Sequence, residues 1–396
     1  SETAKEKAGL LPAGYEIAYD QFRVAGDDAK KADKTGGAKL TTSAEDANLI
    51  VSSSKLNFIF NKRSGLVTSY KVSGTEYFSD GFGLQPNFWR GPTDNDYGNG
   101  GPEREQIWKQ SSRNFNVTDA SAVMDGDNVI VKATYLLPAG NLYIINYKIY
   151  PSGVVNVSAH FTSTEMSAAE TEVSEATRTA TFSPGMEAAR KDASKLNVPR
   201  IGVRFRLPVA MNTVNYFGRG PEENYWDRKA GTLVGLYQTT ADKMYFPYVR
   251  PQENGHHCDT RWLSLTAGKG KGMLIVADNL IEFNALRNSI EDFDDEEYTD
   301  LPRQWNNFSP EMIADHNEAD AKNKLRRQTH INNITPRDFV EVCVDMKQQG
   351  VAGYNSWGAR PLPEYSLPAN RDYQWGFTLV PIGSVSEAQA KSRLKY

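Results

Sequence analysis

The run VIVKATYLLPAGNLYIINYKIYPSGVVNVSAHF, residues 129–161, decides the fold class. Apolar and polar residues alternate from Tyr143 to Tyr150 and again from Val154 to Phe161, which is the period-two pattern of half-buried strands. Pro151-Ser152-Gly153 places turn-forming residues between these two runs. This stretch therefore predicts a hairpin in an antiparallel protein.

The same alternation recurs in the runs Lys55–Asn61 and Asp338–Met346, and Lys62-Arg63-Ser64-Gly65 follows the first as a second hairpin turn. Helical periodicity is weak. Its best candidates, Met186–Ser194 and Pro310–Leu325, carry no long apolar stripe. We predict an all-β chain, a large antiparallel β-sandwich with at most a few short helices.

A polar, aromatic-free segment near the start, Gly26–Gly37, has the composition of a linker. The residues before it contain one good strand, Tyr15–Val24, which cannot form a core alone. We therefore expect residues 1–26 to be the last strand of a preceding domain, residues 27–45 to be a linker and residues 46–396 to be one large domain.

The overall charge and hydropathy limit the partners. A formal net charge of −4 over 396 residues gives no basic field for a phosphate backbone, so nucleic acid is not an expected partner. No run reaches the length of a transmembrane helix, and the first residues lack a signal-peptide pattern, so no membrane partner is expected. The compartment, cytoplasmic or periplasmic, stays open. The polar stretch Thr162–Pro199 predicts a surface excursion between strands.

No metal site is expected from the sequence. Cys258 and Cys343 lie far apart and lack the spacing of a structural zinc site. They are interpreted as buried thiols, which could form one disulfide if the fold brought them together. The acidic run Glu291–Glu297 lacks the spaced ligands and turn glycine of a calcium loop, which favours a solvated loop.

Three segments are unusually rich in aromatic, amide, acidic and glycine residues: Asn87–Gly98, Asn215–Arg228 with its continuation Tyr245–Trp262, and Gly353–Gly358. This mixture suits sugar binding, because rings stack on apolar CH faces while polar side chains bind hydroxyl groups. An aromatic sheet core flanked by Arg/Asp pairs would have the same composition, so both interpretations remain open. Gly218-Arg219-Gly220 lacks the strand and helix context of a nucleotide site.

The order of three longer motifs is more specific. WRGPTDNDYGNG (89–100), NYFGRGPEENYWDRKAGTLVGLYQ (215–238) and MYFPYVRPQENGHHCDTRWLSL (244–265) together resemble the carboxy-terminal small-chain domain of glycoside hydrolase family 2 β-galactosidases. LLPAGYEIAYDQFRV (10–24) is similar to the last strand of the immunoglobulin-like domain that precedes it in such enzymes. The resemblance implies a galactose mutarotase-like supersandwich within an enzyme that hydrolyses terminal non-reducing β-D-galactose residues.

The resemblance also implies that the catalytic carboxylates lie in a barrel domain outside this chain, since no βα-repeat pattern is present. We therefore expect no catalytic residue here and no activity from the chain alone. The family's magnesium and sodium ions belong to other domains, so no cofactor is expected. The implied partners are a β-galactoside and the other domains of the enzyme, and a homo-oligomer is left open.

Residues of the sugar site carry over by position. Trp357 matches a tryptophan of the active-site wall on which the sugar stacks, and Asn355 lies beside it. Tyr354 and Asn355 replace acidic residues often found in the family's loop. The mobile loop at the active-site entrance is matched by a set of four residues: Asp94, Asn95, Asp96 and Gly98. Gly98 is either its hinge or a plain turn glycine.

Other polar residues of the motifs receive structural roles. Four of them are interpreted as buried ion-pair and amide scaffolding: Glu222, Asn224, Asp227 and Arg228. His256 and His257 match no functional position of the family. Two rival functions remain. One is an autonomous carbohydrate-binding module, and the other is a mutarotase-like epimerase with a histidine and a carboxylate as acid and base.

Overall fold

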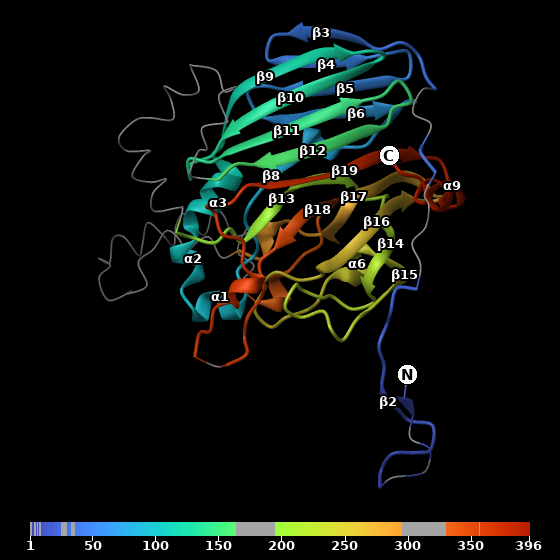
Figure 1. The fold of residues 1–396 in the computed structure, drawn as a ribbon. Helices are drawn as coiled ribbons and strands as arrows, with labels where there is room; N and C mark the ends of the chain where they lie inside the picture. The colour runs from blue at the N-terminus through green and yellow to red at the C-terminus, as the bar shows by residue number, and fades with distance from the viewer. Residues whose placement is uncertain are drawn as a thin grey trace, which may run out of the picture.

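The computed structural model describes all residues except 1, 4, 6, 8, 25–29, 33–35, 164–194, 295–329 and 356. Within the described residues, a 12-stranded antiparallel sheet forms most of the body (Figure 1). Nine of its strands form a continuous path: β9 (Asn116–Asp125), β10 (Asn128–Leu136), β11 (Leu142–Ile149), β12 (Val155–Phe161), β14 (Thr213–Gly220), β15 (Leu233–Thr240), β16 (His257–Ala267), β17 (Lys271–Leu286) and β19 (Tyr373–Ile382).

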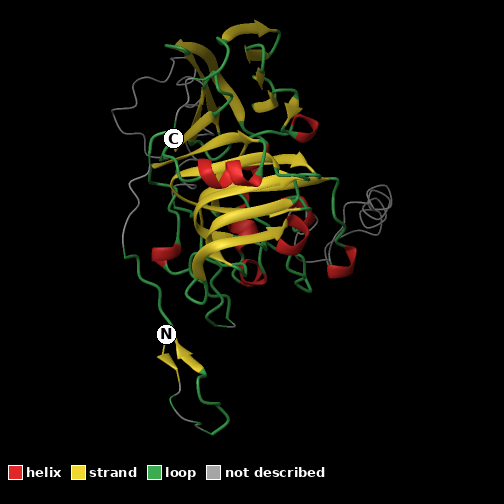
Figure 2. Ribbon diagram, turned by 90° about the vertical axis from the view of Figure 1, so that its right-hand side faces the viewer, coloured by secondary structure: helices red, strands yellow, loops and turns green. Residues whose placement is uncertain are grey.

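The spatial order along this path is β15-β14-β16-β17-β19-β12-β11-β10-β9. Three further strands branch from it: β8 (Gln85–Asn87), β13 (Arg200–Pro208) and β18 (Phe339–Gln348). β18 pairs with both β13 and β17, and β8 pairs with β13. Figure 2 shows how strongly the large sheet curls. The predicted all-β antiparallel fold is confirmed.

A second, 5-stranded sheet lies beside the β9–β12 end of the large sheet (Figure 1). Its strands are β3 (Thr41–Glu45), β4 (Asn48–Ser52), β5 (Leu56–Asn61), β6 (Leu66–Val72) and β7 (Thr75–Glu76). Burial alternates along β5, and the buried rings of Phe58 and Phe60 lie 5.7 and 6.1 Å from the ring of Tyr147 on β11. These rings belong to one hydrophobic core that the two sheets share. Burying each of these side chains contributes roughly 1.5–3 kcal/mol.

Both predicted hairpins are present. β5 pairs with β6 and β11 pairs with β12, each across the turn expected from the sequence. Gly65 and Gly153 adopt positive φ angles of 70° and 87° in these turns, a conformation that disfavours residues with a Cβ atom. The two cysteines are free buried thiols, so the disulfide alternative is wrong.

The helices of the described residues are short, as predicted. They are α1 (Asp94–Gly98), α2 (Gly101–Arg104), α3 (Gln106–Arg113), α6 (Ala241–Met244) and α9 (Val385–Lys391). Trp108 of α3 is fully buried, with its ring 5.9 Å from that of Phe161. The helix candidates Met186–Ser194 and Pro310–Leu325 lie outside the described residues. None of the helices described is long and apolar enough to cross a membrane.

The first four residues of the acidic run that begins at Glu291 do not form a solvated loop. The prediction of a solvated loop is wrong for these residues. Asp294 is 4 % exposed, and its carboxylate lies 2.8 Å from the ammonium group of Lys109. Glu291 pairs at 2.7 Å with Arg204 of β13, and Asp292 pairs with a third basic residue, Arg337. Basic side chains from three other segments form ion pairs with these carboxylates. Residues 295–297 lie outside the described part.

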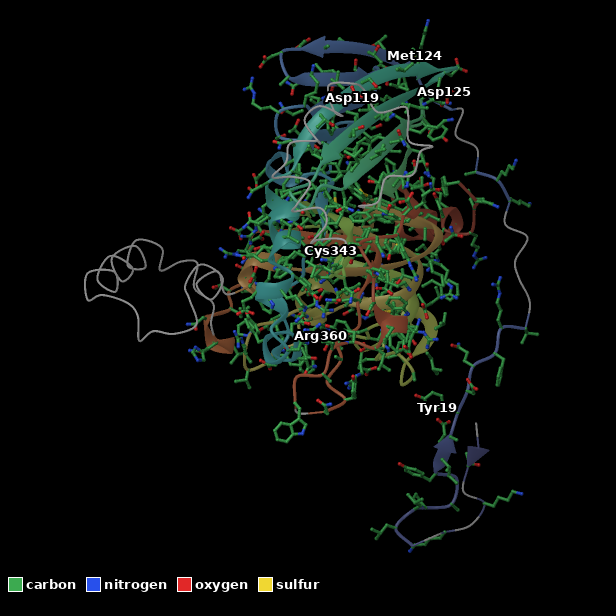
Figure 3. All side chains as sticks on the ribbon, turned by 60° about the vertical axis from the view of Figure 1, so that its left-hand side comes forward. Tyr19, Asp119, Met124, Asp125, Cys343 and Arg360 are labelled. Carbon is green, nitrogen blue, oxygen red and sulfur yellow. The ribbon has the colours of Figure 1, made fainter. Side chains whose placement is uncertain are left out.

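The amino-terminal segment lies mostly apart from the body (Figures 1 and 2). There β1 (Glu2–Thr3) pairs with β2 (Glu16–Ala18) in a separate two-stranded sheet. Tyr19, labelled in Figure 3, donates a hydrogen bond of 3.0 Å to the carbonyl of Gly231. That this segment ends a preceding domain stays a prediction. β3 begins at Thr41, so the ordered sheet starts within the predicted linker, residues 27–45.

Candidate functional site

Helix α1 and the loop that follows β18 lie against each other, although more than 250 residues separate them. The side-chain amide of Asn95 donates a 2.8 Å hydrogen bond to the carbonyl of Val351. A Cβ atom placed on Gly358 would lie 2.5 Å from the carbonyl oxygen of Gly98, so only glycine permits this approach. The predicted entrance segment and the predicted tryptophan loop thus form one surface. In Figure 1 the loop projects near α1 in orange.

The third aromatic-rich segment reaches the same place. The guanidinium of Arg250 stacks over the ring of Tyr97 in α1, 3.5 Å from its centroid. The amide of Gln252 donates to the carboxylate of Asp94 at 2.9 Å and accepts from the backbone N–H of Asp94 at 3.0 Å. The fold therefore brings together all three segments that the composition singled out.

Helix α1 begins with a reciprocal cap. The hydroxyl of Thr93 accepts from the backbone N–H of Asp96 at 3.1 Å, and the carboxylate of Asp96 accepts from the backbone N–H of Thr93 at 2.9 Å. Gly98 ends the helix outside the positive-φ region. The self-capping expected of this segment is present, but it forms a helical turn. Movement of the segment remains a prediction.

Arg90 links α1 to the end of β18 from inside the protein. Its guanidinium makes two bonds to the carboxylate of Asp96, at 3.0 and 2.8 Å, and donates to the carbonyls of Gln349 at 2.7 Å and Gly350 at 3.1 Å. Arg90 is 2 % exposed. Burial acts to lower the pKa of Arg90, but Asp96, with Glu253 and Glu105, outweighs it and the pKa is raised, so the guanidinium stays charged.

Asp227 holds the next two residues of the chain. Its carboxylate accepts from the backbone N–H groups of Val351 at 2.9 Å and Ala352 at 2.8 Å, and the guanidinium of Arg228 donates to the carbonyl of Ala352. A Cβ atom on Gly350 would lie 2.6 Å from Asp227 Oδ2. We call residues 348–352 the root of the loop. Every residue from 349 to 352 has a backbone group bound by Arg90, Asp227 or Arg228.

We call residues 353–358 the tip, and among its described residues the side chains of Tyr354, Asn355 and Trp357 are exposed. Trp357 is 92 % exposed and Tyr354 is 61 % exposed. The side chain of Asn355 accepts from the backbone N–H of Trp357 at 2.9 Å, which closes a short turn. Core packing, the plain structural alternative for Trp357, is therefore excluded. The two rings are available to a ligand or to another part of a larger protein.

Comparison with known proteins decides the family. Residues 52–379 match the model of the β-galactosidase small chain. The chain belongs to this family. It is 32 % identical to the β-galactosidase of Priestia megaterium over 93 % of its own length and 30 % of that protein. It is also 25 % identical to the β-galactosidase of Streptococcus thermophilus over 96 % of its length and 31 % of that enzyme.

The small chain thus spans about a third of the length of these relatives. Solved structures with a similar sheet include a galactose 1-epimerase from Lactobacillus acidophilus, with a TM-score of 0.39 and 7 % identity over 87 % of this chain and 98 % of that one. A putative mutarotase from Salmonella typhimurium has a TM-score of 0.37 and 11 % identity over 86 % and 92 % of the two chains. These enzymes are galactose mutarotase-like, and scores this low say nothing about the site.

The scaffolding predicted for this small chain is confirmed in part. Asn224 is fully buried, and its amide donates to the carbonyls of Arg219 and Glu222, each at 3.1 Å. Asp227 has the scaffolding role described above. Glu222 and Arg228 are exposed, so the prediction that they are buried is wrong. Arg228 still has a scaffolding contact, because its guanidinium donates to the carbonyl of Ala352.

Sequence reasoning missed Arg90, the residue that binds the root through the carbonyls of Gln349 and Gly350. Its neighbours Phe88 and Trp89 are buried, and an arginine inside such an apolar run must have buried partners. That pattern is visible in the sequence and indicates a buried ion pair. Its partners cannot be read from the sequence, because the carbonyls of Gln349 and Gly350 lie about 260 residues away.

Proposed function

We propose that this small chain is the carboxy-terminal part of a β-galactosidase that hydrolyses terminal non-reducing β-D-galactose residues. In this proposal the chain completes the sugar site and the catalytic groups lie elsewhere in the enzyme. Family membership supports the enzyme class. The observation that carries the specific role is the exposure of Trp357 at the end of a loop whose root is fixed by buried hydrogen bonds.

Trp357 acts in this proposal as a flat apolar wall. The CH groups on one face of galactose stack on an aromatic ring, and the contact contributes roughly 1–2 kcal/mol. Asn355 and Tyr354 lie within the same turn and offer an amide and a phenol to sugar hydroxyl groups. Retaining hydrolysis requires two carboxylates about 5–5.5 Å apart, which the catalytic part of the enzyme supplies.

The amino-terminal segment fits the same proposal as a connection to the preceding domain. Gln21 binds the edge strand β15 through its side-chain amide, which donates to and accepts from the backbone of Val234 at 2.8 Å each way. This contact fixes where the preceding segment meets the body.

The chain assayed alone tests the division of labour. We expect no hydrolysis of a chromogenic β-galactoside by the purified chain at any concentration. Recombining the chain with the catalytic portion of the enzyme should restore hydrolysis. Turnover by the chain alone at an enzyme-like rate would contradict the proposal.

One observation favours a second candidate, an autonomous carbohydrate-binding module. Trp357 and Tyr354 are exposed together, as in a surface that binds sugar without a second domain. Titration of the chain with β-galactosides, followed by tryptophan fluorescence, separates the two. Millimolar or tighter affinity that is lost in Trp357→Ala would favour the module, whereas absence of binding would leave the site-completing role.

A further inference from the structure

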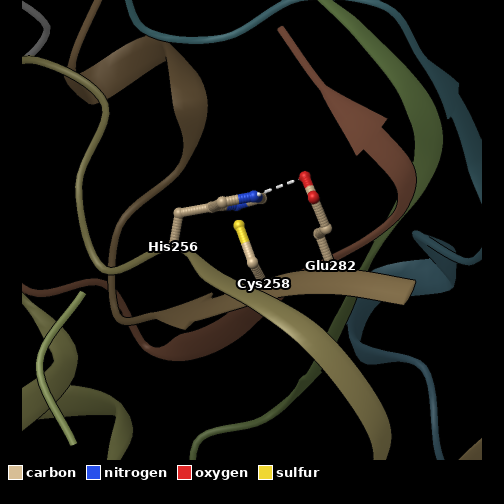
Figure 4. A group of neighbouring side chains, drawn as sticks. All are labelled: His256, Cys258 and Glu282. Atoms are coloured by element: carbon tan, nitrogen blue, oxygen red, sulfur yellow. Dashed lines mark hydrogen bonds and ion pairs between the residues drawn. The ribbon is translucent and has the colours of Figure 1, made fainter. Parts of the chain in front are cut away.

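A buried group of three potential metal ligands lies away from the exposed tip. His256, Cys258 and Glu282 are at most 1 % exposed, and one ligand atom from each lies within 4.8 Å of the other two. Figure 4 shows the thiol of Cys258 and the carboxylate of Glu282 on either side of the end of the imidazole ring.

Strand geometry explains why these side chains meet. Cys258 lies in β16, and His256 immediately precedes that strand, so the two side chains, two residues apart in extended backbone, project to the same face. Glu282 belongs to β17, whose residue Phe283 pairs with His257. The neighbouring strand therefore supplies the third ligand, 24 residues after Cys258, a spacing that no short sequence pattern contains.

The separations suit a small tetrahedral ion. His256 Nε2 lies 3.0 Å from Glu282 Oε2. Two such ligands with metal bonds of about 2.0–2.1 Å would lie about 3.3 Å apart, and a nitrogen and a thiolate sulfur would lie about 3.6 Å apart. The imidazole and carboxylate are therefore already at coordinating separation, and a small movement of Cys258 brings its sulfur to the same distance.

The hydrogen bonds within the group leave ligand capacity unused. His256 Nδ1 is buried and has no hydrogen-bond partner within the described structure. The thiol of Cys258 hydrogen-bonds the carboxylate of Glu282 and lies 3.6 Å from the carbonyl of Asn224. Buried polar atoms are almost always paired, so the unpartnered ring nitrogen of His256 leaves this group with an interaction to gain from an ion.

We propose that His256, Cys258 and Glu282 bind one Zn²⁺ ion. Imidazole, thiolate and carboxylate are the three side-chain types that zinc combines in proteins. The ion replaces the proton on the Cys258 sulfur, and this proton leaves the site. One ring nitrogen of His256 binds the ion and the other carries the ring proton. The carbonyl of Asn224 or a water molecule fills the fourth position.

The charges around the group are compatible with a bound Zn²⁺ ion. Zinc, one thiolate and one carboxylate sum to zero. Lys347, 3.3 Å from Glu282 Oε1, keeps its place on the oxygen that does not face His256.

The ion would brace the root of the tip loop. Glu282 Oε2 accepts from the backbone N–H of Gln348 at 2.8 Å, and the next two residues along the chain are those whose carbonyls Arg90 holds. Zinc is thus a structural ion, separate from sugar binding, and each proposal can fail without the other.

Metal titration of the full chain, without a histidine tag and after treatment with a chelator, tests this site. We expect one equivalent of Zn²⁺ to remain after desalting and the midpoint of thermal unfolding to rise. Co²⁺ should give a thiolate-to-metal charge-transfer band in the near ultraviolet. Wild-type protein that retains less than a tenth of an equivalent, or that binds Co²⁺ without this band, would overturn the proposal.

Variants assign the band to its sulfur. Cys258→Ser should abolish the band and lower zinc affinity by more than the roughly 10–100-fold that loss of a supporting group costs. The matched control is Cys343→Ser, which removes the other buried thiol and should keep both band and affinity. Loss of the band in Cys343→Ser, with the band kept in Cys258→Ser, would overturn the assignment of the band to Cys258. If Cys258→Ser does not fold, Glu282→Gln decides: it should keep the band but weaken binding, and unchanged affinity would contradict the ligand set.

Discussion

The root and the tip of the loop that follows β18 differ in almost every physical respect. Charged side chains hold the root: the buried Arg90 and the half-buried Asp227 together bind backbone groups from Gln349 to Ala352. The tip carries a tryptophan that is 92 % exposed and adds nothing to the core. The difference teaches that stability and proposed function are separated within the eleven residues 348–358. Each prediction below tests this separation.

Breaking the root should have the largest effect. Arg90→Met leaves the carboxylate of Asp96 buried without its partner, and we expect unfolding free energy to fall by about 3–5 kcal/mol. Urea unfolding of both proteins measures the loss. Arg63→Met is the matched control, because its pair with Asp46 is 3.7 Å long and exposed on both sides. A loss below about 1 kcal/mol in Arg90→Met would show that the root does not support the fold.

A buried histidine, His257, should make stability depend on pH. Burial lowers the pKa of His257 from 6.5 to about 4, although the carbonyls of Pro221 and Gly255 act in the opposite direction. The unfolded chain therefore binds the proton more tightly. The contribution is complete above pH 6.5 and is lost as pH falls through about 4, by roughly 3 kcal/mol. Urea unfolding from pH 4 to 7 should show this slope, and His257→Asn should remove it. An equal dependence of the unfolding free energy on pH in the wild type and in His257→Asn would refute the assignment of this slope to His257.

Weakening one contact at the root should have an intermediate effect. Asp227→Asn keeps one carbonyl oxygen for the two N–H groups of Val351 and Ala352, and we expect a loss of about 1–2 kcal/mol. Hydrogen exchange at these two amides should accelerate, while exchange in β5 stays unchanged. Glu222→Gln, on an exposed neighbour, serves as the control. Equal protection in both variants would mean that Asp227 does not hold the root.

Changing the tip should leave stability unaltered. Trp357→Ala removes an exposed side chain, so the free energy of unfolding should stay within about 0.5 kcal/mol of the wild type. Urea unfolding is again the measurement. A loss above about 1 kcal/mol would mean that Trp357 packs on the body, and the contrast between root and tip would not hold.

Local patterns in the sequence predicted the strands and hairpins well. Alternation along β5 and the turn glycines Gly65 and Gly153 depend on neighbouring residues alone. Helix α3 was not predicted, because it is short and largely polar, and the burial of Trp108 comes from distant rings. Burial of Asp294 was also missed, because Lys109 lies far from it in sequence.

The candidate site shows the same division. Motif resemblance singled out Trp357 and the segment that became α1, but composition could not distinguish an exposed ring from a core ring. The hydrogen bonds from Arg90 to the root, and the contact between His256 and Glu282, depend on which strands pair. Such contacts between distant segments leave no periodic signal in the chain.

The central claim is that Trp357 contributes to sugar binding without supporting the fold. Its most direct test is kcat/KM for a β-galactoside in the enzyme completed by this chain, comparing wild type, Trp357→Ala and Val123→Ala, which changes an exposed apolar residue on β9. We predict a fall of roughly 5–30-fold in Trp357→Ala alone, equivalent to about 1–2 kcal/mol, with unchanged thermal stability. An unchanged kcat/KM in Trp357→Ala would contradict the account.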